Sequence, residues 1–276
     1  MVERTRLRLD VSYDGTDFSG WAAQPDRRTV AGVLVQALDL VLGAGTATGL
    51  TVAGRTDAGV HATGQVCHLD LPTDVWRQHE GTLLRRLARL LPTDVRVRAM
   101  TEVPADFDAR FSATFRRYGY RVTDAPWGAE PLRRHDTLAW PKRLDLAALN
   151  AAAAGLVGEH DFAAYCRRKE NATTLRAVTR LDWRRDPDGI LVATVQADAF
   201  CQAMVRSLVG AMLVVGDGRR PADWPAGLLT RRERASEVTV APAHGLTLVA
   251  VGYPVDPAEY AARATLTRRL RVTPDA

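Results

Sequence analysis

Residues 29–43 have the sequence TVAGVLVQALDLVLG, in which apolar side chains recur with the period of an α-helix. Thr29 can cap this helix at its start, and Gly43 can end it. The sequence before it alternates apolar and polar residues over positions 7–13, and two further strands are predicted around positions 50–52 and 66–71. We therefore expect the helix to bury its apolar face against a sheet.

A second helix is predicted from Thr73 or Asp74 to Leu91, with a strand at 95–100 after it. The second half of the chain repeats this coarse pattern, with strands and helices predicted at 115–122 (strand), 144–156 (helix), 177–183 and 190–196 (strands), 204–213 (helix) and 246–251 (strand). We expect an α+β protein of two domains, residues 1–105 and 106–276, whose sheets are mainly antiparallel. Two such halves can pack together and leave a cleft between them.

The composition indicates an ordinary folded protein with a polyanionic partner. The 276 residues are 46% hydrophobic and carry a formal net charge of +5, and clustered cations favour binding to phosphates. The N-terminus lacks the pattern of a signal peptide, and no apolar run has the length of a membrane span. Cys67, Cys166 and Cys201 are far apart, which argues against a disulfide framework and a structural zinc site. We expect a cytoplasmic protein that is not embedded in a membrane.

Arginine is the usual cation of this chain, because lysine occurs only twice. It forms four doublets, Arg27-Arg28, Arg116-Arg117, Arg167-Arg168 and Arg219-Arg220. Each doublet could line a path for RNA or belong to a solvated surface.

The run GRTDAGVHA, residues 54–62, is the strongest candidate for a site. Gly54 and Gly59 allow a tight turn and close approach of a ligand. Arg55 can hold Asp57 ionised, which would make Asp57 an anionic nucleophile or base. Asp57 could equally be a turn residue that binds nearby backbone N–H groups. His61 could be a general base or a solvated side chain.

Several blocks of the chain resemble the tRNA pseudouridine synthase A family. Residues 54–62 resemble its catalytic motif, and the other matching blocks are YDGTDFSGW (13–21), FDARFSATFRRYGY (107–120), AF (199–200), MVR (204–206), VG (209–210), GL (245–246) and VAV (249–251). The blocks occur in the expected order over almost the whole chain. Ala22, where the family commonly has glutamine, and Asp108, where histidine is common, depart from the pattern.

The resemblance implies the pseudouridine synthase fold and the isomerisation of uridine to pseudouridine at positions 38, 39 and 40 of tRNA. It implies the anticodon arm of tRNA as the substrate, a homodimer, and neither a cofactor nor a metal. It assigns catalysis to Asp57, whose carboxylate attacks C1′ or assists departure of the base through a glycal route. It assigns substrate binding to Arg55, Tyr118, Arg206 and Leu246. Arg55 would pair with Asp57, and Tyr118 would stack on the uracil.

Two other functions are compatible with parts of the sequence. A hydrolase or nuclease could use Asp57 and His61 with a divalent ion, for which Asp14, Asp17 and Asp70 are candidate ligands. An RNA-binding protein without chemistry would also fit the basic charge. The glycine-flanked Arg55-Thr56-Asp57 argues against a pure binder, which has no need of a carboxylate facing phosphates.

Overall fold

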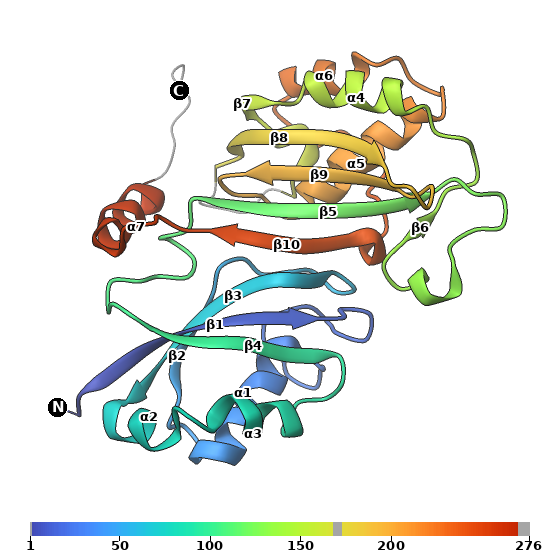
Figure 1. Ribbon diagram of the computed structural model, residues 1–276. Helices are drawn as coiled ribbons and strands as arrows, with labels where there is room; N and C mark the ends of the chain where they lie inside the picture. Colours follow the sequence, from blue (N-terminus) through green and yellow to red (C-terminus); the bar gives the residue numbers. More distant parts are fainter. Residues whose placement is uncertain (1, 168–172, 270–276) are drawn as a thin grey trace. The chain divides into compact units, whose positions relative to one another are not determined.

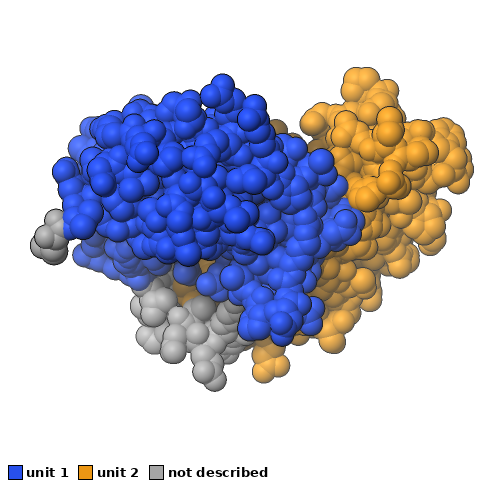
Figure 2. Space-filling model, turned by 90° about the horizontal axis from the view of Figure 1, so that it is seen from below, with its two compact units in different colours: residues 1–114, 248–269 blue, residues 115–247, 270–276 orange. Residues whose placement is uncertain are grey.

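The computed structural model describes residues 2–167 and 173–269 and shows mixed α and β structure with mainly antiparallel strands (Figure 1). The chain divides into two compact units, Met1–Thr114 with Leu248–Arg269 and residues 115–247, which Figure 2 colours separately. The predicted division into domains at residues 105 and 106 stays a prediction. The compact units divide after Thr114, and the first of them also takes in a segment from the end of the chain.

The first unit is a sheet with helices. Its elements are β1 (Arg4–Tyr13), α1 (Val30–Leu42), β2 (Thr48–Val52), β3 (His61–Pro72), α2 (Thr73–His79), α3 (Leu83–Leu90), β4 (Val95–Val103) and α7 (Tyr260–Arg268). The strands run in the order β4-β1-β3, all antiparallel, and β2 pairs with β3. β1 is therefore a central strand, and its inward side chains alternate with polar ones as predicted.

The helix predicted at residues 29–43 is confirmed as α1. The Thr29 hydroxyl accepts a hydrogen bond from the Gly32 N–H at 3.3 Å, and the helix ends at Gly43. The periodicity predicts an apolar face of Val30, Val33, Leu34, Ala37, Leu38 and Val41, and all of these are buried except Val33, which is half-buried; Ala31 is buried in addition. Local sequence is sufficient here because cap, period and stop all agree.

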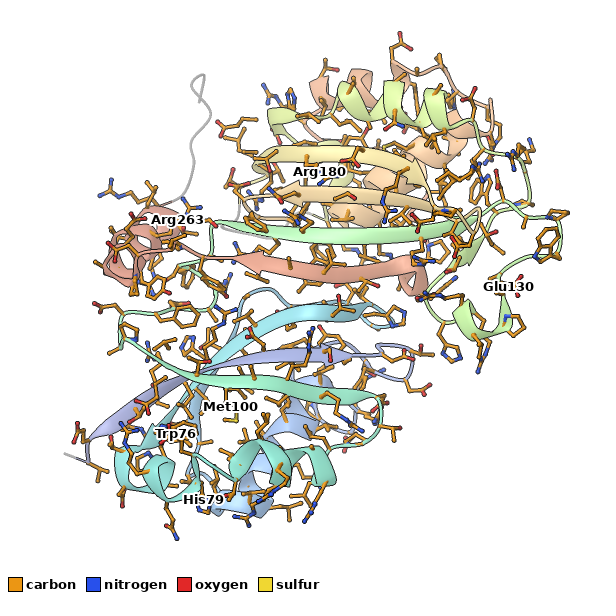
Figure 3. All side chains as sticks on the ribbon, in the orientation of Figure 1. Trp76, His79, Met100, Glu130, Arg180 and Arg263 are labelled. Atoms are coloured by element: carbon orange, nitrogen blue, oxygen red, sulfur yellow. A yellow bond between two sulfur atoms is a disulfide. The ribbon has the colours of Figure 1, made fainter. Side chains whose placement is uncertain are left out.

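The prediction of a single helix over residues 73–91 is wrong, because two short helices, α2 and α3, occupy this stretch. Gly81 has a low helix propensity, and the Thr82 N–H turns back to the His79 carbonyl oxygen at 2.9 Å. Trp76 anchors α2: its indole N–H donates to Glu102 of β4 at 2.5 Å (Figure 3 labels Trp76). The interruption between α2 and α3 therefore has two causes: Gly81 is a weak helix former, and the sheet holds the Trp76 side chain of α2.

The second unit has a sheet in the order β5-β9-β8-β7. Its elements are β5 (Phe115–Thr123), β6 (Leu138–Ala139), α4 (Leu146–Ala154), β7 (Gly158–Asp161), β8 (Leu175–Arg185), β9 (Leu191–Ala197), α5 (Met204–Gly216) and α6 (Trp224–Gly227). β6 pairs parallel with β5, while the other pairs are antiparallel. β10 (Leu246–Gly252) begins in this unit and continues into the first.

Short 3-10 helices complete the described structure at Pro131–Arg133, Ala163–Tyr165, Leu228–Thr230, Ala243–Gly245 and Pro257–Glu259. Within the described residues, no helix is long and apolar enough to cross a bilayer.

The cysteines of the second unit correct one expectation from the sequence. Cys166 and Cys201 are joined as a disulfide, with their Cα atoms 5.7 Å apart. Cys67 is a free, buried thiol of the first unit. The sequence separation of 35 residues gives no local sign of the Cys166–Cys201 pair, because only the fold of the second unit brings the two segments together.

Candidate active site

Asp57 lies on the connection between β2 and β3, as the sequence predicts. The chain turns directly after it: the Val60 N–H donates to the Asp57 carbonyl oxygen at 3.2 Å, and Gly59 has a φ of +76°. Side chains with a Cβ disfavour that conformation, so a glycine suits the turn. The turn leaves Asp57 half-buried and Arg55 exposed.

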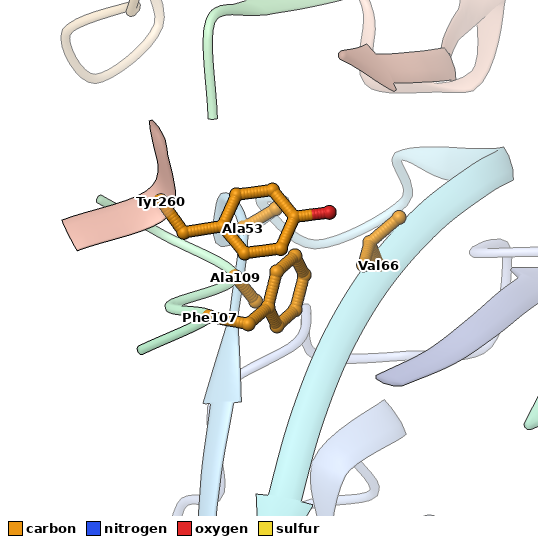
Figure 4. Packing of buried hydrophobic residues seen from close by; sticks show 5 residues of the cluster. All are labelled: Ala53, Val66, Phe107, Ala109 and Tyr260. Carbon is orange, nitrogen blue, oxygen red and sulfur yellow. The ribbon is translucent and has the colours of Figure 1, made fainter. Parts of the chain in front are cut away.

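A small apolar cluster supports the base of this loop (Figure 4). Ala53 immediately precedes the loop, and its N–H donates to the carbonyl oxygen of Val66 on β3 at 2.8 Å. Phe107, Ala109 and Tyr260 complete the cluster. Tyr260 belongs to α7, so a segment from the end of the chain helps to hold the loop that carries Asp57.

The segment after β1 packs against the same loop from another side. The Trp21 N–H donates to the Thr56 carbonyl oxygen at 3.1 Å, and the Gly59 N–H donates to the Phe18 carbonyl oxygen at 3.3 Å. Gly20 has a φ of +94°, and a Cβ there would lie 2.8 Å from the Thr56 carbonyl oxygen. The glycine next to Trp21 therefore permits a close approach that a larger residue would prevent.

Three buried polar side chains form a hydrogen-bonded chain beneath the loop. The Gln65 amide donates to the Gly54 carbonyl oxygen at 2.9 Å and to the Tyr13 hydroxyl at 3.2 Å. The Tyr13 hydroxyl lies 2.8 Å from the hydroxyl of Thr56. Sequence reasoning missed Gln65, because the strand predicted around residues 66–71 begins after it, whereas β3 begins at His61.

The carboxylate of Asp57 and the guanidinium of Arg55 are not joined by an ion pair within the described structure, and the pairing that the resemblance implies stays a prediction. Among residues 2–167 and 173–269, neither side chain makes a hydrogen bond to another group. Hydrogen bonds thus hold the backbone of the loop.

His61 has a structural position next to the loop. Its ring is buried, and its Nδ1 atom accepts a hydrogen bond from the Gly15 N–H at 2.9 Å. The same nitrogen lies 3.1 Å from a carboxylate oxygen of Asp14. The Gly15–His61 hydrogen bond ties the segment after β1 to the start of β3.

Tyr118 belongs to the second unit, where it lies on β5 opposite Val195 of β9. Its ring is buried and meets the ring of Phe200 edge to face, with centroids 5.2 Å apart. Such a contact fixes the orientation of a ring that could stack on a base.

Arg206 and Leu246 are also in the second unit. Arg206 lies on α5, and its Nε–H donates to the Ala241 carbonyl oxygen at 2.6 Å. Leu246 is the buried first residue of β10. Nearby, the Tyr120 hydroxyl donates to the Pro242 carbonyl oxygen at 2.8 Å, and burial raises the pKa of Tyr120 above its ordinary value. The predicted site residues thus fall into two groups, Arg55 and Asp57 in one unit and the other three in the other.

Several arginines of the four doublets have partners within the protein. Arg28 forms an ion pair with Asp94 at 2.8 Å, and Arg219 forms one with Asp217 at 2.6 Å. Arg116 is buried and donates to the Asp198 carbonyl oxygen at 2.8 Å. Arg168 lies outside the described residues. The doublets are therefore not a uniform basic surface.

Comparisons with a family profile and with known proteins indicate the same family. A family profile described as tRNA pseudouridine synthase matches residues 152–254. Proteins named tRNA pseudouridine synthase A are similar to this chain in Frankia casuarinae (61% identical over 269 residues), Streptomyces griseus (58% over 272) and Mycobacterium leprae (50% over 280). These matches cover 98% of this chain and 96%, 95% and 96% of the respective relatives. At this identity and coverage, the chain belongs to the tRNA pseudouridine synthase A family.

Proposed function

We propose that this chain isomerises uridine to pseudouridine at positions 38, 39 and 40 in the anticodon stem and loop of tRNA, with Asp57 as the catalytic carboxylate. Conversion of uridine to pseudouridine in tRNA follows from the family. The positions within tRNA and the roles of single residues are the proposal. The observation that supports it best is the Asp57 loop, whose backbone is held by β3 and by the segment after β1 while the carboxylate has no protein partner among the described residues.

The reaction breaks the N1–C1′ bond of uridine, turns the uracil and joins C5 to C1′. The proton that leaves C5 is balanced by one gained at N1, so no atom is added or lost and no electron is transferred. A single carboxylate can support this exchange, as a nucleophile at C1′ or by assisting departure of the base as a glycal forms. We therefore propose a reaction that needs no cofactor and no metal.

The other predicted residues bind the substrate in this proposal. Arg55, exposed beside Asp57, would contact the RNA backbone and hold the target nucleotide out of the stack. Tyr118 would stack on the uracil, with its ring set by Phe200. Arg206 would bind phosphate and Leu246 would pack against the base. In this proposal, all of these groups act on one nucleotide.

The test is Asp57→Asn, which removes the charge with almost no change in shape. We expect the variant to bind an anticodon stem-loop as tightly as the parent and to form no pseudouridine from substrates with a single uridine at 38, 39 or 40. Pseudouridine is counted by base-specific chemical labelling, with chelator present throughout. Asp74→Asn, the same change at an exposed residue of α2, is the matched control and should keep full activity.

Each alternative function gives its own result in this experiment. Cleaved RNA, or activity that disappears with chelator, would favour the metal-dependent hydrolase. Binding without any product from the parent protein would favour an RNA-binding protein. Asp57→Asn with parental activity would refute the role of Asp57.

We further propose that the protein acts in the cytoplasm as a homodimer. The basic charge of +5 suits a tRNA partner, and an RNA that spans two subunits would explain how a small protein holds a whole tRNA. Light scattering coupled to gel filtration tests this directly: a mass of one chain would contradict the homodimer, with or without anticodon stem-loop.

A further inference from the structure

Tyr13, Thr56 and Gln65, which form the hydrogen-bonded chain, are buried. Their exposed fractions are 5%, 6% and 0%, so substrate has no direct access to most of these atoms. Buried polar groups persist when every one of them has a partner, and a satisfied network holds its members in one arrangement. The network therefore acts within the protein, and its position beneath the Asp57 loop indicates that it supports this loop.

The orientation of the Gln65 amide is fixed by its surroundings. Its nitrogen donates to the Gly54 carbonyl oxygen and to the Tyr13 hydroxyl, while its oxygen accepts the N–H of Val66 at 3.2 Å. Both amide hydrogens and the amide oxygen are thus used, so a flipped amide would place like groups against one another. The Tyr13 hydroxyl accepts a hydrogen bond from the Gln65 amide and can donate one to the Thr56 hydroxyl, 2.8 Å away.

The network forms hydrogen bonds with the loop on both sides of Arg55. Gly54 is held through its carbonyl oxygen and Thr56 through its hydroxyl. The Thr56 carbonyl oxygen also accepts the Trp21 N–H at 3.1 Å. The backbone immediately before Asp57 therefore has no freedom to shift without breaking one of these bonds, whereas the Asp57 side chain makes none of its own among the described residues.

We propose that Tyr13, Thr56 and Gln65 are positioning residues that set the place of the Asp57 carboxylate for reaction at C1′. This inference rests on the proposed role of Asp57. A catalytic group displaced by about 1 Å can lose about 100-fold in rate, and a carboxylate with no side-chain partner depends on its backbone for its place. The rate constant of the chemical step, rather than RNA affinity, is therefore the quantity that the network controls.

The experiment compares Thr56→Val with Thr56→Ser. Valine keeps the shape of threonine and loses the hydroxyl, whereas serine keeps the hydroxyl. For Thr56→Val we expect kcat to fall by about 10- to 100-fold at saturating tRNA, with KM and the dissociation constant for tRNA within about twofold of the parent. Thr56→Ser should restore kcat to within about threefold of the parent.

Thr5→Val is the matched control, because it removes a hydroxyl from the same unit at the other end of β1. Thr5 shares a hydrogen bond with Thr73 at 3.1 Å, away from the loop. A lower free energy of unfolding alone would affect both valine variants and leave kcat unchanged at a temperature where both are folded. Equal kcat for Thr56→Val, Thr5→Val and the parent would overturn the proposal.

Tyr13→Phe and Gln65→Met test whether the three hydrogen-bonded side chains act together as one network. Each single change should lower kcat, and the double variant should lower it little further, because either change already interrupts the chain. Multiplied effects on kcat would contradict a single network. If Asp57→Asn is inactive while these variants keep parental kcat, the positioning role fails and the proposed function stands. If Asp57→Asn is active, the proposed function itself fails.

Discussion

Asp57 lies on the loop before β3 and Asp70 lies near the end of that strand, and the two show how differently one residue type is used. Asp57 has no side-chain partner among the described residues. Asp70 is paired across the strands with Arg6, whose Nε and Nη2 atoms donate to its two oxygens at 2.8 and 2.9 Å. A carboxylate engaged by a bidentate arginine stabilises the fold and is poorly placed to act as a metal ligand.

The Arg6–Asp70 pair predicts a dependence of stability on pH. The hydrogen bond from Arg6 lowers the pKa of Asp70 below its ordinary value of 3.8. Because the pKa is depressed in the folded state, the stabilisation is complete above pH 4 to 5 and is lost as the pH falls through the folded-state pKa. In urea unfolding, Asp70→Asn should be less stable than the parent at pH 7, and the difference should shrink by pH 3. A difference that is constant with pH would contradict this assignment, and exposed Asp74→Asn is the control.

At the scale of single elements, α1 and the stretch that forms α2 and α3 contrast in how far local pattern determines them. α1 has its cap, its period and its stop in consecutive residues, and it forms where these signals place it. The next helical stretch has a clear apolar pattern but contains Gly81, and it divides into two helices with Trp76 bound to the sheet. An apolar period alone does not say whether a helix continues across a weak point.

The Thr29 cap of α1 predicts a measurable stability change. Thr29→Ala should lower the free energy of unfolding by about 1 kcal/mol, because the Gly32 N–H loses its acceptor at the buried start of the helix. Thr29→Ser keeps the hydroxyl and should recover most of this loss. Thermal or urea unfolding followed by circular dichroism measures both variants. Equal stability of the alanine variant and the parent would show that water replaces the cap.

For the whole molecule, the path of the chain is as important as its elements. Residues 248–269 belong to the same compact unit as the N-terminal 114 residues. Tyr260 of this segment meets Phe107 edge to face, with ring centroids 5.2 Å apart, in the cluster beneath the Asp57 loop. The last part of the sequence therefore completes the unit that carries the candidate catalytic residue.

Tyr260→Ala in the full chain should consequently destabilise the first unit by about 3 kcal/mol or more, as expected for truncation of a buried aromatic ring. Tyr260→Phe keeps the ring and is the matched control, with stability close to that of the parent. Hydrogen exchange followed by mass spectrometry locates the effect: faster exchange should be concentrated in residues 53–66 and around Phe107. Faster exchange confined to α7 would show that the cluster does not depend on Tyr260.

The sequence by itself determined the local features of this protein. The period and caps of residues 29–43 predicted α1, the alternation over 7–13 predicted β1, and the motif at 54–62 with its ordered companion blocks identified the family. The helix and strand signals each lie within a few residues of one another, so short-range sterics, hydrogen bonding and side-chain periodicity are enough to produce them.

Only the tertiary structure decided which distant residues meet. The support of Thr56 by Tyr13 and Gln65, the contribution of Tyr260 to the first unit, and the pairing of Cys166 with Cys201 all join positions that no local pattern connects. The physical reason is that such contacts depend on strand order and on close packing of the core, which are properties of the whole fold. The sequence motif predicted Asp57 as the catalytic residue, and the fold showed which contacts hold its loop in place.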